Sequence, residues 1–333
     1  MLQNDLNITE TLDVNALWER QDTMAVFSVL IMVVILFGNG TVVISIIRYQ
    51  HLRTPTNHFV LTLALTDIML ALSLPYHTVS YVHPFLTKQK YACLWRYISF
   101  LLPCGTSQTH VLAITLDRYL SVVHPLHYSS LMSTKKVFII SGLLWLYSSV
   151  LGFVPFYWNY WDGHSACNLN IVFPVGYMII LVVQFFFISI IVIILYLKVF
   201  AIAKRLQKGI LKPNNDITPG PTKKKFKNSR SLLLYGIVVC FFCFLWTPFF
   251  TVVLIQMLWF NNNALLIFGR GFTLLGLTTS ITNPVTYVFL NKGFHKAYRD
   301  MFHLKKKNIF VKKQQGLPHA DFIKISSYNG NLQ

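Results

Sequence analysis

The residues with the clearest potential for chemistry are an acid and a base that stand side by side. Asp117 and Arg118, followed by Tyr119, end a run of mostly apolar residues, and a Pro-Leu pair follows at 125–126. Charges at the edge of a membrane are costly to desolvate, so we expect this acid and base to pair. The pair could act as a switch that releases Arg118 in one state. The alternative is a local salt bridge that only fixes the end of a helix.

Catalysis is not indicated by the remaining polar residues. An intramembrane hydrolase would need clustered His, Asp or Glu side chains for zinc binding or acid–base work. Besides Asp117, the apolar runs hold or border only Asp67, His58, His77 and His110, at scattered depths. We therefore predict that the chain is not an enzyme. A transporter is a distant alternative, because the sequence lacks the paired charges or symmetric broken helices expected of one.

The elements that position these residues are predicted to be membrane-spanning helices. The chain has 333 residues, of which 54% are hydrophobic and 12% charged, whereas a soluble domain carries about a quarter charged residues. Seven apolar runs are long enough to cross a bilayer, at 24–47, 57–80, 93–120, 137–158, 174–200, 231–259 and 264–290. The fold class is thus an all-α membrane protein with a seven-transmembrane helix bundle. Apolar residues at helical spacing between Phe294 and Phe302 predict a short amphipathic eighth helix.

The distribution of charge predicts the orientation. The net charge is +18, and the basic residues gather after the first, third and fifth runs and in the tail. By the positive-inside rule the N-terminus is extracellular and the C-terminus cytoplasmic. We expect an extracellular tail at 1–22, a membrane domain at 23–303 and a cytoplasmic tail at 304–333. Asn7 begins a glycosylation sequon in the first tail. The bases are expected to face membrane lipid and an acidic protein partner, and not nucleic acid.

Short motifs distributed over the seven runs carry a family resemblance. They are Gly38-Asn39, Leu65-Thr66-Asp67, Cys93, Asp117-Arg118-Tyr119, Trp145, Phe242 with Trp246-Thr247-Pro248, and Asn283-Pro284-Val285-Thr286-Tyr287. Their order and spacing resemble those of the rhodopsin-like G-protein-coupled receptors over about residues 20–303. The resemblance implies a multi-pass receptor of the plasma membrane that activates a heterotrimeric G protein.

The resemblance also implies roles for individual residues. Cys93 and Cys167 are expected to form a disulfide on the oxidising side of the membrane. A sodium ion that favours the inactive state would bind at Asp67, Ser107, Ser280 and Asn283; no other cofactor is implied. A toggle on the sixth helix would consist of Phe242, Trp246 and Pro248. On activation Tyr196 and Tyr287 would meet Arg118, and Leu126 would insert into the G protein.

The outer ends of the helices should hold the ligand. Phe100 stands where amine receptors place an Asp, so an amine is not expected. Nearby residues suit a small apolar or lipid ligand with a polar head; they are Tyr97, Phe100, Phe249, Phe250, Val253 and Leu254.

Two cations, Arg96 and Arg270, stand at the rim of this region. They either extend to the membrane interface or hold the ligand's head. Their positions resemble those in the lipid-amide-sensing subfamily represented by the glucose-dependent insulinotropic receptor. This resemblance implies that activation of the G protein raises cAMP. An adenosine- or melanocortin-related receptor is the alternative.

Overall fold

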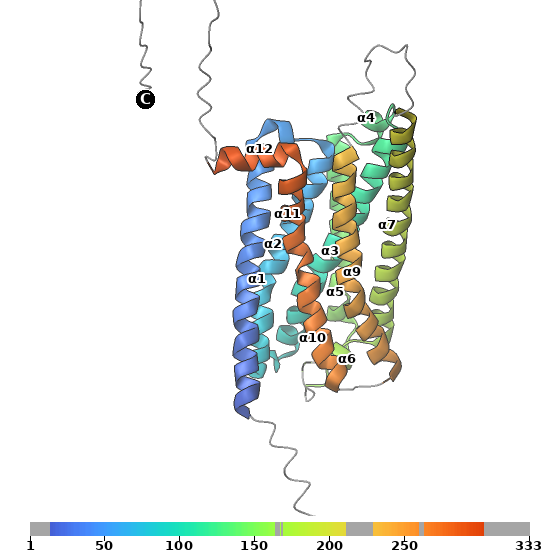
Figure 1. The fold of residues 1–333 in the computed structure, drawn as a ribbon. Coiled ribbons are helices and arrows are strands. Elements are labelled where there is room, and N and C mark those ends of the chain that lie inside the picture. Colours follow the sequence, from blue (N-terminus) through green and yellow to red (C-terminus); the bar gives the residue numbers. More distant parts are fainter. Residues whose placement is uncertain (1–13, 164–166, 168, 211–228, 260–262, 303–333) are drawn as a thin grey trace, which may run out of the picture.

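The computed structural model describes residues 14–163, 167, 169–210, 229–259 and 263–302. These residues form a bundle of long helices that run roughly side by side (Figure 1). Helix α1 begins at one end of the bundle, and α12 lies across the other end. The predicted sequon at Asn7 falls outside the described residues.

The helices follow the predicted apolar runs, except that α1 begins ten residues before its run and α7 ends ten residues after its run. The long helices are α1 (Val14–Arg48), α2 (Pro55–Val82), α3 (Lys90–Val123), α5 (Thr134–Tyr157), α7 (Val175–Ile210) and α9 (Ser229–Trp259). They are followed by α10 (Asn263–Leu277), α11 (Thr279–Leu290) and α12 (Lys292–Met301). Short helical turns connect some of them: η1 (Gln50–Leu52), η2 (Pro84–Thr87), α4 (Tyr128–Leu131) and α6 (Leu169–Val172).

Five of the described helices contain a stretch that is long and apolar enough by itself to cross a membrane. These stretches are Ala25–Arg48, Pro55–Ser80, Thr134–Tyr157, Val175–Ile202 and Val238–Leu258. Helix α3 is not among them. Its buried face is rich in polar residues, including Ser107, Gln108, Thr109, His110 and Asp117. It packs against α2, α5, α7 and α9, and so lies inside the bundle. Polar residues of a spanning helix are expected to face the interior in this way.

The seventh apolar run, predicted as one segment, consists of two helices that meet at Thr278. The main chain tightens there, since the Thr278 N–H donates to Leu275 O at 3.1 Å and Ile281 N–H donates to Thr278 O at 3.0 Å. One turn further on, Pro284 has no N–H to offer the carbonyl of Ser280. That carbonyl instead accepts a hydrogen bond from the Asn39 amide at 2.9 Å. The irregularity therefore joins the seventh span to the first.

Local caps explain where several helices begin. The Thr54 hydroxyl accepts from the main-chain N–H of Asn57, and Pro55 occupies the first helical position of α2. Ser133 caps α5 in the same manner. The Asn291 side chain accepts from Gly293 N–H at 2.9 Å and starts α12. Such side-chain oxygens satisfy main-chain donors that have no partner within the helix.

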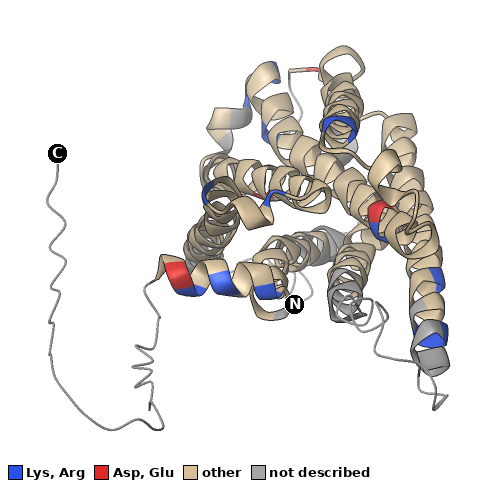
Figure 2. Ribbon diagram, turned by 90° about the horizontal axis from the view of Figure 1, so that it is seen from above, with Lys and Arg blue, Asp and Glu red and all other residues tan. Residues whose placement is uncertain are grey.

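Helix α12 is amphipathic, as predicted. Phe294 and Ala297 are fully buried, and the Tyr298 hydroxyl hydrogen-bonds with Thr41 and with the carbonyl of Gly38 in α1. The opposite face carries basic residues, which Figure 2 shows along the helix. Because its apolar side is held against α1 and η1, α12 lies across the end of the bundle.

Candidate functional site

The predicted acid–base pair is present at the end of the bundle that carries α4 and α12. The Arg118 guanidinium lies 2.6 Å from the Asp117 carboxylate, and its Nε–H also donates to that carboxylate at 3.1 Å. Asp117 is fully buried, whereas the Arg118 side chain is 15% exposed. A buried carboxylate of this kind depends on its donors, since an unpaired one would be strongly destabilising.

Two further donors hold Asp117. The Thr56 hydroxyl, at the start of α2, donates to Asp117 Oδ2 at 2.7 Å, and the Tyr128 hydroxyl of α4 donates to Oδ1 at 2.7 Å. Burial raises the pKa of the Tyr128 phenol, so it stays protonated and can donate at neutral pH. The ion pair is therefore tied to two neighbouring elements, which is more than a salt bridge at one helix end requires.

The other predicted signalling residues belong to α3, α7, α11 and the segment after α3. The Tyr196 ring fills the space above Gly236 of α9, so closely that a Cβ on that glycine would overlap it. Tyr287 is buried and stacks on Phe294 of α12, with ring centroids 5.8 Å apart. The meeting of both tyrosines with Arg118 stays a prediction for an activated state. Leu126 is 88% exposed and available to a partner, and Tyr119 is half-buried.

A second polar centre lies deeper in the bundle. Asp67 is buried and accepts from the Ser280 hydroxyl at 2.7 Å and from the Asn283 amide at 2.9 Å. Ser107 is also buried, although none of the described hydrogen bonds joins it to Asp67. The structure thus brings together three of the four residues predicted to bind sodium.

The residues around Asp67 fit a small hard cation. Their ligand atoms are carboxylate, hydroxyl and amide oxygens, which such ions prefer. Asn39 is linked to Ser280, and its buried Oδ1 has no hydrogen-bond partner among the described residues. A buried carboxylate held only by neutral donors needs a cation or a proton. A sodium ion here would supply positive charge between α2, α3 and α11.

The predicted toggle lies between the two ends of the bundle. Trp246 is buried, its ring centroid is 6.4 Å from that of Phe242, and its indole N–H donates to Thr279 at 3.2 Å. Gly276 leaves room for the indole, because a Cβ there would stand 2.9 Å from three of its atoms. Pro248 follows within α9. The tryptophan therefore contacts the junction of α10 and α11 directly.

Aromatic rings connect the toggle to the predicted ligand region. Phe100 is buried, 6.4 Å from Trp246 by ring centroids, and it stacks on His77 of α2 at 5.3 Å. The Arg96 guanidinium lies 5.3 Å from the Tyr97 ring, within cation–π range. Arg96 is only 4% exposed, so it does not extend into the surroundings of the bundle.

The α9 side of this region is also aromatic. Phe250 stacks on Phe185 of α7 at 4.1 Å, and Phe249 meets Trp246 edge-on at 5.9 Å. Val253 is buried, but Leu254 is 36% exposed, because the next residue along a helix is turned by about 100°. Leu254 therefore faces away from the residues that it was predicted to join. Arg270 belongs to α10, and its side chain lies outside what the structure describes.

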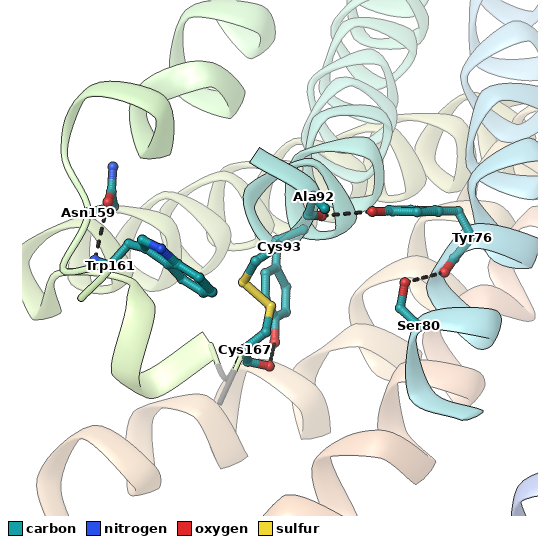
Figure 3. Close-up of a disulfide and its surroundings, with 8 residues drawn as sticks. Tyr76, Ser80, Ala92, Cys93, Asn159, Trp161 and Cys167 are labelled. Carbon is teal, nitrogen blue, oxygen red and sulfur yellow. Dashed lines mark hydrogen bonds between the residues drawn. A yellow bond between two sulfur atoms is a disulfide. The ribbon is translucent and has the colours of Figure 1, made fainter. Parts of the chain in front are cut away.

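The predicted disulfide between Cys93 and Cys167 is formed, with the Cα atoms 5.8 Å apart. Tyr97 donates to the carbonyl of Cys167 at 3.2 Å, and Tyr76 of α2 donates to Ala92 O at 2.9 Å beside it (Figure 3). The disulfide thus anchors the segment before α7 to the start of α3, next to the ligand region.

Several site residues were not found from the sequence. Thr56, Tyr128, His77, Thr279 and Gly236 carry no motif by themselves. Their roles arise from contacts between elements, such as that of Thr56 with Asp117, which are 61 positions apart in the chain. The only available signal was that His77 is an isolated polar residue in an apolar run.

Comparison with known proteins identifies the family. Residues 38–287 match the family described as 7 transmembrane receptor (rhodopsin family). Trace amine-associated receptor 2 of Rattus norvegicus is 28% identical over 300 residues, covering 84% of this chain and 86% of that receptor. The histamine H2 receptor of Cavia porcellus is 28% identical, covering 84% and 79%. The octopamine receptor beta-2R of Chilo suppressalis is 25% identical, covering 81% and 77%.

These relatives are named for amines, so they do not support the finer resemblance to a lipid-amide-sensing subfamily. They agree with the wider prediction of a receptor that is not an enzyme. The family match covers the Asp117–Arg118 pair, the Asp67 centre, the toggle and the disulfide. The chain therefore belongs to the rhodopsin family of seven-transmembrane receptors.

Proposed function

We propose that this receptor lies in the plasma membrane, binds a small molecule at the outer ends of its helices, and activates a heterotrimeric G protein that raises cAMP. The observation that carries the proposal is the ion pair of Asp117 and Arg118, held by donors from two other elements. Aromatic contacts from Phe100 to Trp246 provide a route from ligand to toggle. Movement of α9 would then loosen the ion pair and free Arg118.

The side chains of the ligand region favour a polar head that accepts hydrogen bonds or carries negative charge. Phe100 offers a ring, and not a carboxylate, on α3. The buried Arg96 and the ring of His77 lie beside it. The apolar body of a ligand would contact Phe249 and Phe250. A small lipid or lipid amide has both features, and this is our first candidate for the ligand.

An aromatic amine is the second candidate, favoured by the names of the relatives. Without a carboxylate at Phe100, an ammonium group could still be attracted to the faces of Phe100 or Trp246. Cation–π contacts of this kind contribute about 0.5–2 kcal/mol, which is less than a buried charge pair would give.

The experiment compares cAMP in cells expressing the receptor, Arg118→Ala, Arg96→Gln or Lys88→Gln at equal surface levels. Lys88 is an exposed base at the same end of the bundle and serves as the matched control. Cells receive fatty-acid ethanolamides, lysophosphatidylcholine, tyramine or histamine. A lipid response that is lost in Arg118→Ala, and weakened about tenfold or more in Arg96→Gln but not in Lys88→Gln, supports the first candidate. An amine response unaffected by Arg96→Gln supports the second.

A further inference from the structure

A polar pair lies on the membrane-facing side of the bundle, away from both sites described above. Tyr147 of α5 donates to Gln184 Oε1 of α7 at 3.1 Å. Tyr147 is 46% exposed and Gln184 is half-buried. Because the tyrosine hydroxyl donates to the amide oxygen, both N–H donors of the Gln184 amide remain for another partner. None of the described hydrogen bonds takes them up.

This pair is near the middle of the bilayer. Gln184 follows the start of α7 by nine residues, or about 13 Å of helix, and the half-thickness of the hydrocarbon layer is about 15 Å. Water and charged head groups do not reach that depth. A donor exposed there is costly unless an oxygen atom reaches it from a neighbouring molecule.

The adjoining face of α3 is open at this place. Leu102 contacts α5, since it lies 3.1 Å from where a Cβ on Gly152 would stand, and Gln108 donates to Phe185 O of α7 at 3.2 Å. Gly105 lies between these two residues on the same helical face, because residues three apart are neighbours. Apart from the backbone of α3 itself, a Cβ on Gly105 would have no heavy atom within 4 Å. Space therefore exists between the contacts that α3 makes with α5 and α7.

We propose that Gln184, Tyr147 and Gly105 form a second binding site, which takes a neutral lipophilic molecule from the bilayer. Its carbonyl oxygen accepts a hydrogen bond from the Gln184 amide, and its hydrocarbon part rests on Val150 and Phe187, which are 62% and 63% exposed. A charged lipid head does not fit at this depth. A second copy of the chain fits poorly too, because helices associate in membranes through small residues, and this face carries bulky ones.

The test uses two photoreactive probes of equal length, a diazirine-bearing long-chain ketone and the matching alkane with the same diazirine. Full-length receptor in phosphatidylcholine nanodiscs is labelled with each probe, and labelled peptides of α5 and α7 are quantified. We expect the ketone to label these peptides about threefold to tenfold more than the alkane, from one hydrogen bond within the membrane. Gln184→Met, which keeps the side-chain length, should reduce the ratio to about one. Ile194→Leu, at an exposed position further along α7, should leave it unchanged.

Equal labelling by the two probes in the wild-type receptor would overturn the proposal. So would a ketone preference that persists in Gln184→Met. Loss of a polar group from a lipid-facing position should not impair folding, which is checked by the melting temperature of each variant. Energy transfer between two differently tagged copies is measured in parallel. If labelling shows no ketone preference and Gln184→Met lowers that transfer, the face is an interface between copies and the lipid site is refuted.

Discussion

Asp117 is the buried carboxylate that, in the proposed function, controls the state of the receptor. It accepts from Arg118, Thr56 and Tyr128, which come from three different elements. Each donor that leaves raises the cost of keeping the negative charge buried. The burial of this carboxylate therefore depends on the packing of α2 and α4 against α3, as well as on the ion pair.

Tyr128→Phe tests this dependence, because it removes one donor and keeps the ring. A hydrogen bond to a charged group contributes about 1.5–3 kcal/mol, so we expect ligand-free nucleotide exchange on the G protein to rise by about tenfold to a hundredfold. Tyr160→Phe is the control, since that tyrosine is exposed at the other end of the bundle. Unchanged exchange in Tyr128→Phe would mean that α4 does not restrain Asp117.

A second prediction concerns a single residue, Asp67. We expect sodium to bind at Asp67 and to stabilise the resting state. The melting temperature of the purified receptor should be several degrees higher in sodium chloride than in choline chloride at equal ionic strength, because a ligand that binds only the folded form stabilises it. Asp67→Asn should abolish the difference. If Asp67→Asn keeps the full sodium effect, the ion binds elsewhere.

At the scale of elements, glycines allow the backbone of a helix to approach a large aromatic side chain closely. Gly276 of α10 lies against the Trp246 indole, whereas Gly271 on the same helix has open space around it. Gly276→Ala should lower the melting temperature, since overpacking costs about 1–3 kcal/mol. Gly271→Ala should raise it slightly, because alanine is favoured over glycine in helices by about 0.5–1 kcal/mol. Equal effects of the two substitutions would contradict the tight Trp246 contact.

Gly236 provides a comparable contact for Tyr196 of α7. Gly236→Ala should destabilise the ligand-free receptor, because the new methyl group would occupy the space of the tyrosine ring. In Tyr196→Leu the same alanine should cost little, so the double variant should be more stable than the sum of the single effects predicts. Melting temperatures of the four proteins measure this coupling. Strictly additive changes would show that the two residues act independently.

The sequence was sufficient to predict most elements, because each apolar run must be a helix in a bilayer. The run at 57–80 became α2, Pro55–Val82, within two residues at each end. Two details depended on three-dimensional contacts. The seventh run is divided at Thr278. Just beyond this point, the Asn39 amide donates to the carbonyl of Ser280, because Pro284 has no N–H for it. Leu254 faces outward because the rotation of α9 is set by packing.

Contacts in the site between residues that are neighbours in the sequence could be predicted, whereas contacts between residues far apart in the sequence could not. Asp117 and Arg118 could be paired by inspection because they are neighbours, and the family resemblance supplied Cys93 with Cys167. Thr56 and Tyr128 could not be found, since no pattern reports which residues of α2 and α4 reach α3. The same holds for His77, whose position against Phe100 follows from the packing of α2 on α3.

At the scale of the whole molecule, the described contacts link the two ends of the bundle. The disulfide and Arg96 lie near Phe100, Phe100 approaches Trp246, and Trp246 is bonded to the seventh span through Thr279. That span also holds Asp67 through Ser280 and Asn283, and it carries Tyr287 near its end at Leu290. In the proposed function, these contacts are the route by which a change at the outer end would reach α9 and α11.

The most direct measurement is nucleotide exchange on purified G proteins of several subtypes, in membranes that contain the wild-type receptor, Asp117→Asn or Arg118→Ala at equal surface levels. We expect Asp117→Asn to raise ligand-free exchange several-fold for at least one G protein, because Arg118 loses its charged partner. Arg118→Ala should reduce exchange by that same G protein to the level of membranes without receptor. If Arg118→Ala exchanges nucleotide as fast as Asp117→Asn, the ion pair is not the switch.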